Sequence, residues 1–506
     1  MSNPLFDALI APNENSTNPF IYEQSGRIWT YSEFVIRVRQ FASALADLGI
    51  NEGDRVALQL EKSVNVLALC QACIQTGAVF LPLNPAYTAT EVEYFLRDSG
   101  AKLFLCSMAK KPDFTDLSRK IGFCLETLDA DQQGSLNTLA EQLPPKSEVA
   151  ERHQDDLAAL LYTSGTTGRS KGAMLTQANL LSNAQTLAKY WDFSKDDVLL
   201  HALPIFHTHG LFVATNTVLL TGGAMRFYEK FSTSDLVKDM PKATAMMGVP
   251  TFYTRLLQDP SFTAEKAKKM RVFISGSAPM LEETHKQFTE RTGHVILERY
   301  GMTETNMSTS NPYRERRKPG TVGRPLPGVE VRISDPNTGT PLKANEIGQI
   351  EVRGPNVFRG YWNMPEKTAA EFRDDGFFIT GDLAFADDDG YVTIVGREKD
   401  LIITGGFNVY PKEVEAAIDE LEGVLESAVI AVPHPDMGEA VVAVVVPSDD
   451  RILETSDISA PLSNRLARFK QPRETVFVEQ LPRNSMGKVQ KAELRKTYAH
   501  LFKIVD

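Results

Sequence analysis

The chain has little cysteine, and its few cysteines carry no strong metal signal. Only four occur in 506 residues, at Cys70, Cys73, Cys106 and Cys124. The first two form a Cys-x-x-Cys pair inside an apolar, helix-like run, but no second pair completes a metal site. We therefore interpret the cysteines as small core residues of a protein in a reducing compartment.

Long apolar runs and an excess of positive charge are also missing. No apolar run is long enough to cross a membrane, and residues 1–7 lack the basic and apolar regions of a signal peptide. The formal net charge of -11 argues against nucleic acid or an anionic membrane as the main partner. Any anionic ligand must then meet a local cluster of positive charge. We expect a cytoplasmic protein, and the sequence leaves a monomer and a homodimer open.

The most informative stretch, Tyr162 to Gly172, reads Tyr-Thr-Ser-Gly-Thr-Thr-Gly-Arg-Ser-Lys-Gly. Its glycines let the backbone come close to a ligand, its hydroxyls can donate hydrogen bonds, and Lys171 adds a positive charge. These properties suit a polyphosphate, although the glycine spacing is not that of a Walker motif. The flanking residues predict a buried strand before the loop and a helix capped by Thr176 after it. By composition alone, a flexible linker is an equal alternative.

The whole string resembles, residue for residue, the phosphate loop of the adenylate-forming superfamily. This superfamily contains acyl-CoA and aryl-CoA synthetases, peptide-synthetase adenylation domains and beetle luciferase. The resemblance implies ATP as a co-substrate, accompanied by Mg²⁺. The loop residues that it assigns to ATP are Thr163, Ser164, Gly165, Thr166, Thr167, Gly168 and Lys171.

The rest of the chain predicts an α/β fold. Helical and strand-like runs alternate from Tyr31 to Cys106, and residues 245–255 and 271–279 each read as a strand followed by a turn. Ligands of open α/β sheets collect at such strand ends. Residues 125–153 are polar and predict a surface excursion, whereas the turn-rich region 318–353 predicts a small β barrel or sandwich.

After Arg397 the pattern becomes that of a second, smaller domain with both helices and strands. The resemblance implies a large N-terminal domain, 1–397, made of two Rossmann-like α/β subdomains and a small β barrel, which holds ATP and the acyl pocket. It also implies a mobile α+β C-terminal domain, 398–506, which carries the catalytic lysine. Lys399 matches the hinge position of the superfamily.

Three histidines lie between His201 and Gly210. A metal site is conceivable, but no carboxylate or cysteine joins the histidines at ligand spacing. The segment resembles the next motif of the superfamily, in which His207 lines the cleft between the acyl pocket and the thiol tunnel. A plain core histidine remains the alternative.

Residues 298–305, Glu-Arg-Tyr-Gly-Met-Thr-Glu-Thr, resemble the second signature of the superfamily. Tyr300 offers an aromatic face to adenine, Thr303 a hydroxyl to the α-phosphate, and Glu304 a carboxylate to the magnesium ion that accompanies ATP. By the same resemblance, the segment 276–279 runs along the adenine. The other residues implied for ATP or AMP are Gly276, Ser277, Ala278, Glu298, Gly301 and Met302.

Three later segments complete the resemblance. Asp382 can accept hydrogen bonds from both ribose hydroxyls and Arg397 can donate to a hydroxyl or a phosphate, with an exposed ion pair as the alternative. Lys488, within residues 481–491, matches the catalytic lysine. The residues that match the loop next to the pantetheine arm of coenzyme A are Gly405, Gly406 and Phe407.

The implied chemistry has two half-reactions in one cleft. A carboxylate attacks the α-phosphate of ATP, giving an acyl-adenylate and pyrophosphate, while Lys488, Thr303 and the phosphate loop hold the negative charge. The C-terminal domain then rotates about Lys399, which withdraws Lys488 and admits coenzyme A to the acyl carbon.

Arg299 bears on which acid is activated. Related ligases commonly have a small residue before the tyrosine of this signature, whereas Arg299 fills that space and adds a cation. Because an unpaired buried guanidinium is costly, we expect a second carboxylate of the substrate to pair with it. Arg255 and His207 could line the same pocket. The chain also resembles malonyl-CoA synthetases over nearly its whole length, which implies malonate, with methylmalonate next.

Several alternatives stay open. Arg299 could pair with a protein carboxylate such as Glu298, and Arg255 could lie outside the pocket. The enzyme could activate another short-chain or aryl acid, or load the phosphopantetheine of a carrier protein. A nucleotide sensor without catalysis and a luciferase-like monooxygenase fit these residues poorly. A basic patch that could meet the coenzyme A 3'-phosphate, but that reads better as a solvated helix face, consists of Arg465, Arg468 and Lys470.

Overall fold

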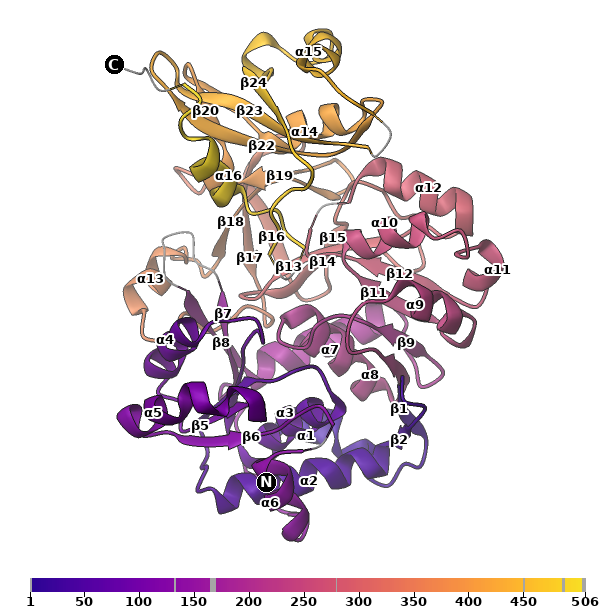
Figure 1. Cartoon of the computed structure of the whole chain (residues 1–506), viewed down its shortest axis with the longest axis vertical. Coiled ribbons are helices and arrows are strands. Elements are labelled where there is room, and N and C mark those ends of the chain that lie inside the picture. The colour runs from indigo at the N-terminus through magenta and orange to yellow at the C-terminus, as the bar shows by residue number, and fades with distance from the viewer. Residues whose placement is uncertain are drawn as a thin grey trace.

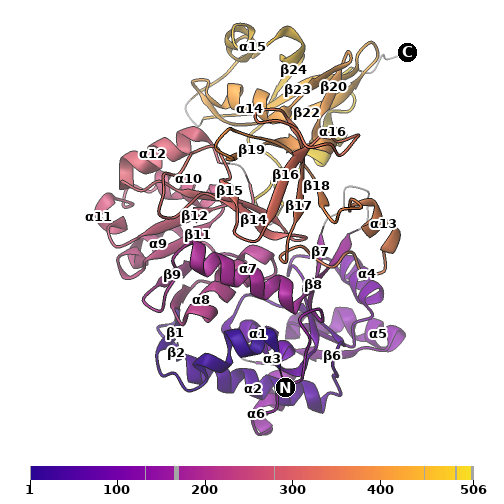
Figure 2. The same ribbon diagram turned by 180° about the vertical axis from the view of Figure 1, so that it is seen from behind.

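The structure, a computed structural model, describes residues 2–131, 133–163, 170–278, 280–448, 451–484 and 487–502. These residues form four β-sheets, most of them covered by helices, and the predicted α/β fold with a separate C-terminal sheet is confirmed. Figures 1 and 2 show the last sheet at one end of the molecule and helices α1 (Pro4–Leu9), α2 (Tyr31–Asp47) and α6 (Ser135–Gln142) at the other. None of the described helices is long and apolar enough to cross a membrane.

A six-stranded sheet in the order β6-β5-β3-β4-β7-β8 is parallel except for its last pair. One of its crossover helices, α3, is buried on all sides, as its apolar run predicts. Cys70 and Cys73 lie in this helix as free, buried thiols, so the prediction that they are core residues is confirmed. Burial raises the pKa of Cys70 to about 12. The bounds are β3 (Arg55–Gln59), α3 (Val64–Thr76), β4 (Val79–Pro82), α4 (Ala89–Ser99), β5 (Leu103–Cys106), α5 (Lys111–Ile121), β6 (Cys124–Thr127), β7 (Leu157–Thr163) and β8 (Lys171–Thr176).

The region expected to be a surface excursion, residues 125–153, is partly structured. Strand β6 forms an edge of the six-stranded sheet, and α6 buries Leu136 and Ala140. The prediction is therefore wrong for this part of the chain. A four-residue strand and an eight-residue helix are too short for their periodicity to stand out from polar neighbours.

A nine-stranded sheet runs in the order β15-β14-β13-β12-β11-β9-β10-β1-β2. Its central strands are parallel, and antiparallel strands close both edges. Thr176 caps the following helix α7 as predicted, because its hydroxyl accepts from the Asn179 amide. The strands are β1 (Pro19–Glu23), β2 (Ile28–Thr30), β9 (Val198–His201), β10 (Ala224–Phe227), β11 (Ala245–Gly248), β12 (Val272–Ser275), β13 (Leu297–Met302), β14 (Asn306–Ser310) and β15 (Arg324–Pro325). The helices are α7 (Gln177–Tyr190), α8 (Thr215–Thr221), α9 (Thr233–Asp239), α10 (Pro250–Gln258), α11 (Ala264–Ala267) and α12 (Glu282–Thr292).

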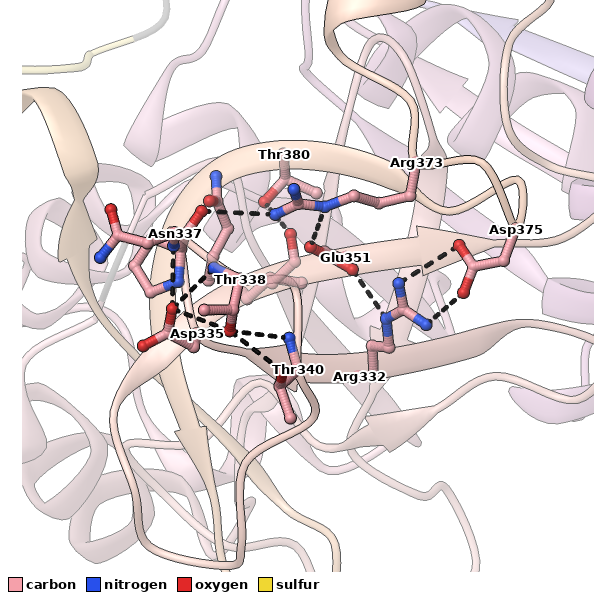
Figure 3. Close-up of polar contacts among 12 residues, drawn as sticks. Arg332, Asp335, Asn337, Thr338, Thr340, Glu351, Arg373, Asp375 and Thr380 are labelled. Carbon is pink, nitrogen blue, oxygen red and sulfur yellow. Dashed lines mark hydrogen bonds and ion pairs between the residues drawn. The ribbon is translucent and has the colours of Figure 1, made fainter.

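The region expected to be a small β barrel is a four-stranded antiparallel sheet, which lies between the C-terminal sheet and the two larger sheets (Figures 1 and 2). A buried ion-pair network joins its strands to the segment after α13 (Figure 3). The Glu351 carboxylate is fully buried and accepts from Arg332 Nε at 2.7 Å and from Arg373 Nε at 2.8 Å. Arg332 also donates to Asp375. The bounds are β16 (Glu330–Ser334), β17 (Gly348–Arg353), α13 (Pro365–Ala370), β18 (Phe378–Ala386) and β19 (Val392–Arg397).

The last sheet has the order β21-β20-β23-β22, and β24 pairs with β23. It starts directly after the short 3-10 turn Glu398–Asp400, which contains the expected hinge residue Lys399. Its bounds are β20 (Ile402–Thr404), β21 (Phe407–Val409), α14 (Pro411–Asp419), β22 (Val424–His434), β23 (Gly438–Pro447), α15 (Thr455–Ser463), β24 (Glu474–Phe477) and α16 (Lys491–Tyr498).

Replacing Glu351 with glutamine should destabilise the four-stranded sheet. The change leaves the guanidinium groups of Arg332 and Arg373 without their shared buried anion, which costs about 3 kcal/mol. Amide hydrogen exchange should therefore accelerate in β17 and β18. The matched control is Glu330→Gln, because Glu330 forms an exposed pair with Arg353 that contributes little to stability. Equal exchange rates in both variants would contradict the role assigned to Glu351.

Candidate active site

Strand β13 turns its side chains to two different environments, because neighbouring residues of a strand point to opposite faces. The Glu298 carboxylate accepts from His285 Nε2 at 2.7 Å and from the Gly320 amide at 3.1 Å. Both contacts use Glu298 Oε1, and no ion pair joins Glu298 to Arg299 among the described residues. The nucleotide role of Glu298 stays a prediction.

Arg299 is a buried cation that forms no ion pair with any described residue. Its side chain is 3% exposed, and no described residue accepts a hydrogen bond from its Nε or Nη2. Gly276 makes room for it, because a Cβ atom there would lie 2.4 Å from the guanidinium carbon. Burial lowers the pKa of Arg299 to about 9, so the group stays charged at neutral pH. Such a site strongly favours an anion that can accept from the guanidinium.

His209 and Ser277 lie beside this guanidinium. Ser277 adopts a positive φ of 72°, rare for a residue with a side chain, and its hydroxyl lies 3.4 Å from His209 Nδ1. His209 Nε2 is buried and has no partner among the described residues. Burial and the nearby Arg299 charge hold the pKa of His209 well below its usual value. The pocket thus combines one cation with two further polar groups.

Sequence reasoning missed His209. The available signal was its place in the three-histidine segment, but the sequence does not distinguish His207 from His209. The structure places His209 at the start of a π-helix, His209–Ala214, a form that occurs often at functional sites. His201, the third histidine, faces Lys62 and the Gly210 carbonyl instead.

Lys488 reaches this pocket from the C-terminal sheet, and Figure 1 shows the segment between β24 and α16 extending toward β13. The Lys488 side chain is exposed. Desolvation and the Arg397 and Arg299 charges lower its pKa, while Asp382 and Glu304 act in the opposite direction. His207 is also close. Its Nε2 is buried without a described partner, and burial together with Lys488 lowers its pKa to about 3.

Asp382 and Arg397, the expected ribose pair, are neighbours across β18 and β19. Arg397 Nε lies 3.0 Å from one Asp382 oxygen, and the Tyr300 hydroxyl donates to the other at 2.6 Å. Lys399 follows directly, and burial and Arg397 lower its pKa. The structure therefore brings the adenine, ribose and hinge candidates together.

Glu304 is the candidate Mg²⁺ ligand. It is 4% exposed, and its Oε1 accepts from the Tyr361 hydroxyl at 3.1 Å and from Thr163 Oγ1 at 3.4 Å. Burial raises its pKa, with Lys171 acting in the opposite direction. The Lys171 ammonium lies 3.1 Å from Glu371. A buried carboxylate near the phosphate loop fits a hard cation, which would compensate its charge.

Other predicted ATP residues adjoin this group. Thr303 lies in the turn between β13 and β14, and Met302 ends β13. Gly301 cannot carry a side chain, because a Cβ atom would lie 1.7 Å from the Asn306 carbonyl oxygen. Ala278 follows Ser277 and is partly buried. The predicted loop residues that lie outside the described part of the chain are Ser164, Gly165, Thr166, Thr167 and Gly168.

Comparison with known proteins agrees with this geometry. The family model described as AMP-binding enzyme matches residues 11–362, and the model described as AMP-binding enzyme C-terminal domain matches residues 413–488. The chain belongs to the AMP-binding enzyme family. The membership predicted from its motifs is therefore confirmed.

Three relatives show the range of similarity, and the names of two of them state different acids. MatB from Rhodopseudomonas palustris is 53% identical over 99% of this chain and 100% of its own, with a TM-score of 0.98 for its ATP-bound structure and 0.85 for its apo structure. Malonate–CoA ligase ACSF3 of Mus musculus is 36% identical and covers 92% of this chain and 86% of its own. Feruloyl-CoA synthase of an Amycolatopsis species is 36% identical over 94% of both chains.

The loop predicted to approach coenzyme A lies beside a small cavity in the C-terminal sheet. Gly405 and Gly406 have φ values of 56° and 84°, which favour glycine. Phe407 is 56% exposed and stacks on Phe469, with ring centres 4.8 Å apart. A cavity of about 150 Å³ is lined by Thr404, Gly405, Phe407, Met437, Val441, Phe469 and Arg473.

The basic patch predicted in this region is partly neutralised. Arg465 pairs with Glu420 and Lys470 pairs with Glu413. This arrangement favours the interpretation of these side chains as a solvated surface. Arg473 lines the cavity directly and is a better candidate for contact with an anionic ligand.

Arg255 lies apart from the Arg299 pocket. It is exposed in the last turn of α10, and its guanidinium carbon lies 5.9 Å from the centre of the Phe231 ring. The predicted role of Arg255 in the acyl pocket therefore loses its support. Helix α10 follows β11, so its position in the sequence suggests a place near the pocket. Side chains of a helix point in different directions, however, and that of Arg255 points to the surface.

Replacing Arg299 with methionine should weaken binding of a small dicarboxylate anion by about 10- to 150-fold, because a charge-assisted pair contributes about 1.5–3 kcal/mol. Steady-state kinetics or calorimetry with wild type and variant measures the change. Arg255→Met is the matched control and should bind the anion as wild type does. An Arg299 variant with unchanged affinity would remove this residue from the pocket.

Proposed function

We propose that this AMP-binding enzyme is an AMP-forming acid–thiol ligase that converts malonate, ATP and coenzyme A into malonyl-CoA, AMP and pyrophosphate. The observation that carries the proposal is the buried Arg299 guanidinium, which has no protein carboxylate among the described residues. A second carboxylate of the substrate supplies the missing anion. The malonate–CoA ligase relatives support this choice of acid.

A short dicarboxylate suits the two cations Arg299 and Lys488. Their charges are coupled, because Arg299 lowers the pKa of Lys488. Malonate, whose carboxylates are separated by one methylene group, can place one carboxylate at Arg299, His209 and Ser277. Its other carboxylate then faces Lys488 and His207. Methylmalonate adds one methyl group and is the next candidate.

In the first half-reaction, the carboxylate near Lys488 attacks the α-phosphate of ATP and pyrophosphate leaves. Lys488 and Thr303 stabilise the charge that develops on the phosphate oxygens. Because these groups are already in place, they need not reorganise when the charge forms. Tyr300, Asp382 and Arg397 orient the nucleoside. Glu304 would hold Mg²⁺, which when bound neutralises phosphate charge and orients the polyphosphate.

In the second half-reaction, the thiol of coenzyme A attacks the acyl carbon and AMP leaves. Lys488 occupies the cleft in the observed arrangement, so the C-terminal domain, 398–506, must move before the thiol can enter. We assign the pivot to Lys399, which lies in the 3-10 turn before β20. The same rotation presents Gly405, Gly406 and the Phe407–Phe469 stack to the pantetheine and nucleotide ends of coenzyme A.

Lys488→Ala should lower the rate of adenylation by about 100- to 1,000-fold, because it removes one preorganised cation from the developing charge. Thioester formation from a supplied malonyl-adenylate should change little, since Lys488 serves the first half-reaction. The control is Lys470→Ala, which removes a surface lysine of the same domain. Equal loss of both half-reactions would contradict this division of roles.

The function is tested by ATP–pyrophosphate exchange with malonate, methylmalonate, succinate, acetate, butyrate and ferulate. We expect exchange with malonate and methylmalonate and little with the monocarboxylic acids, because these leave Arg299 unpaired. Exchange with ferulate or acetate but not malonate would overturn the assignment of the acid. A second assay, with coenzyme A and with a phosphopantetheinyl carrier protein as acceptors, identifies the thiol.

A further inference from the structure

Lys62 is a buried amine that the proposed chemistry does not use. It follows β3, is 7% exposed, and donates from Nζ to the His201 carbonyl at 2.8 Å. Nζ also lies 4.2 Å from the centre of the Phe227 ring and 3.0 Å from His201 Nδ1. No carboxylate in the described part of the chain forms an ion pair with it. Burial lowers the pKa of Lys62 well below its usual value, so this position is costly for an ammonium.

The contacts of Lys62 determine the tautomer of His201. His201 Nε2 lies 2.9 Å from the Gly210 carbonyl oxygen, which can only accept, so we assign the ring proton to Nε2. Nδ1 is then the acceptor for the Lys62 amine. Burial and the Lys62 charge hold the pKa of His201 well below its usual value, so the ring is neutral. Lys62 thus keeps His201 as an Nε2–H donor.

His201 in turn fixes the backbone next to His209. The Gly210 carbonyl accepts from His201 Nε2 and from Thr215 Oγ1, the latter at 2.9 Å. Gly210 also packs so closely that a Cβ atom would lie 2.1 Å from the Pro204 carbonyl oxygen. Gly210 is the second residue of the π-helix that starts at His209. A series of contacts therefore links Lys62 through His201 to Gly210. Gly210 is the neighbour of His209, which lies beside Arg299 and Ser277.

We propose that Lys62 is a positioning residue for recognition of the second carboxylate of the substrate. Through His201 and the Gly210 carbonyl, it holds the first turn of the π-helix so that His209 faces the carboxylate bound by Arg299. The inference rests on the proposed function, in which this pocket holds a substrate carboxylate. A purely structural role would not need a hydrogen-bonding amine here, because a methionine of similar length fills the space without the cost of desolvating a polar group.

The experiment measures the Michaelis constants of Lys62→Met for malonate and ATP in the complete ligase assay. We expect the malonate constant to rise about tenfold, with the ATP constant and melting temperature unchanged, since a small displacement of His209 affects only the acid. In a double variant with His209→Asn, the two effects should not add. Equal changes for both substrates, or an unchanged malonate constant, would overturn the proposal.

Arg37→Met is the matched control. Arg37 is also buried, donates to the Asn65 side chain at 2.8 Å, and lies 4.1 Å from the centre of the Phe41 ring, yet it has no contact with His201. The control should leave both Michaelis constants unchanged. If Lys62→Met does not fold, Thr215→Val weakens the same carbonyl anchor and should raise only the malonate constant, and no rise would overturn the proposal.

The Arg299→Met variant separates this inference from the proposed function. If that variant raises the malonate constant and Lys62→Met does not, only the role of Lys62 fails. If the Arg299 variant also leaves malonate binding unchanged, the pocket does not hold the substrate carboxylate and the proposed function fails with it.

Discussion

The site depends on one unsatisfied charge. Placing a guanidinium in the protein interior is expensive, and the usual solution is a carboxylate from the same chain. Here the nearest candidate, Glu298, is turned to the opposite face of β13 and is held by His285 and the Gly320 amide. Because no described residue supplies the anion, we propose that a ligand does. In this proposal Arg299 selects an acid with two carboxylates.

The groups around Arg299 come from all parts of the fold. His209 begins a π-helix, Ser277 follows β12 with a positive φ, and Lys488 arrives from the C-terminal sheet. Parallel strands end at the same edge of a sheet, so loops that are distant in sequence meet there. This edge is also where the nucleotide residues lie. Acid and nucleotide are thereby placed side by side before any chemistry occurs.

The observed position of the C-terminal sheet suits the proposed first half-reaction. The Lys488 side chain is exposed, and its pKa is coupled to the charges of Arg397, Asp382 and Glu304. The chain also superposes better on the ATP-bound structure of MatB than on its apo structure. The four-stranded sheet provides Asp382 and Arg397 and leads into the turn that contains Lys399, the proposed hinge residue. Its Glu351 network therefore stabilises the sheet from which the proposed rotation starts.

The amino-acid sequence by itself determined the family, the order of the motifs and most long helices and strands, because these depend on local composition and periodicity. It also singled out Arg299 and Lys488. Only the tertiary structure separated Glu298 from Arg299, placed Arg255 at the surface, and brought His209 and Ser277 to the guanidinium. These outcomes depend on which face of a strand or helix a side chain occupies and on contacts between distant segments. Composition does not show which face of a strand each residue occupies. That arrangement decides whether the carboxylate can pair with the arginine, or whether the arginine remains available to the substrate.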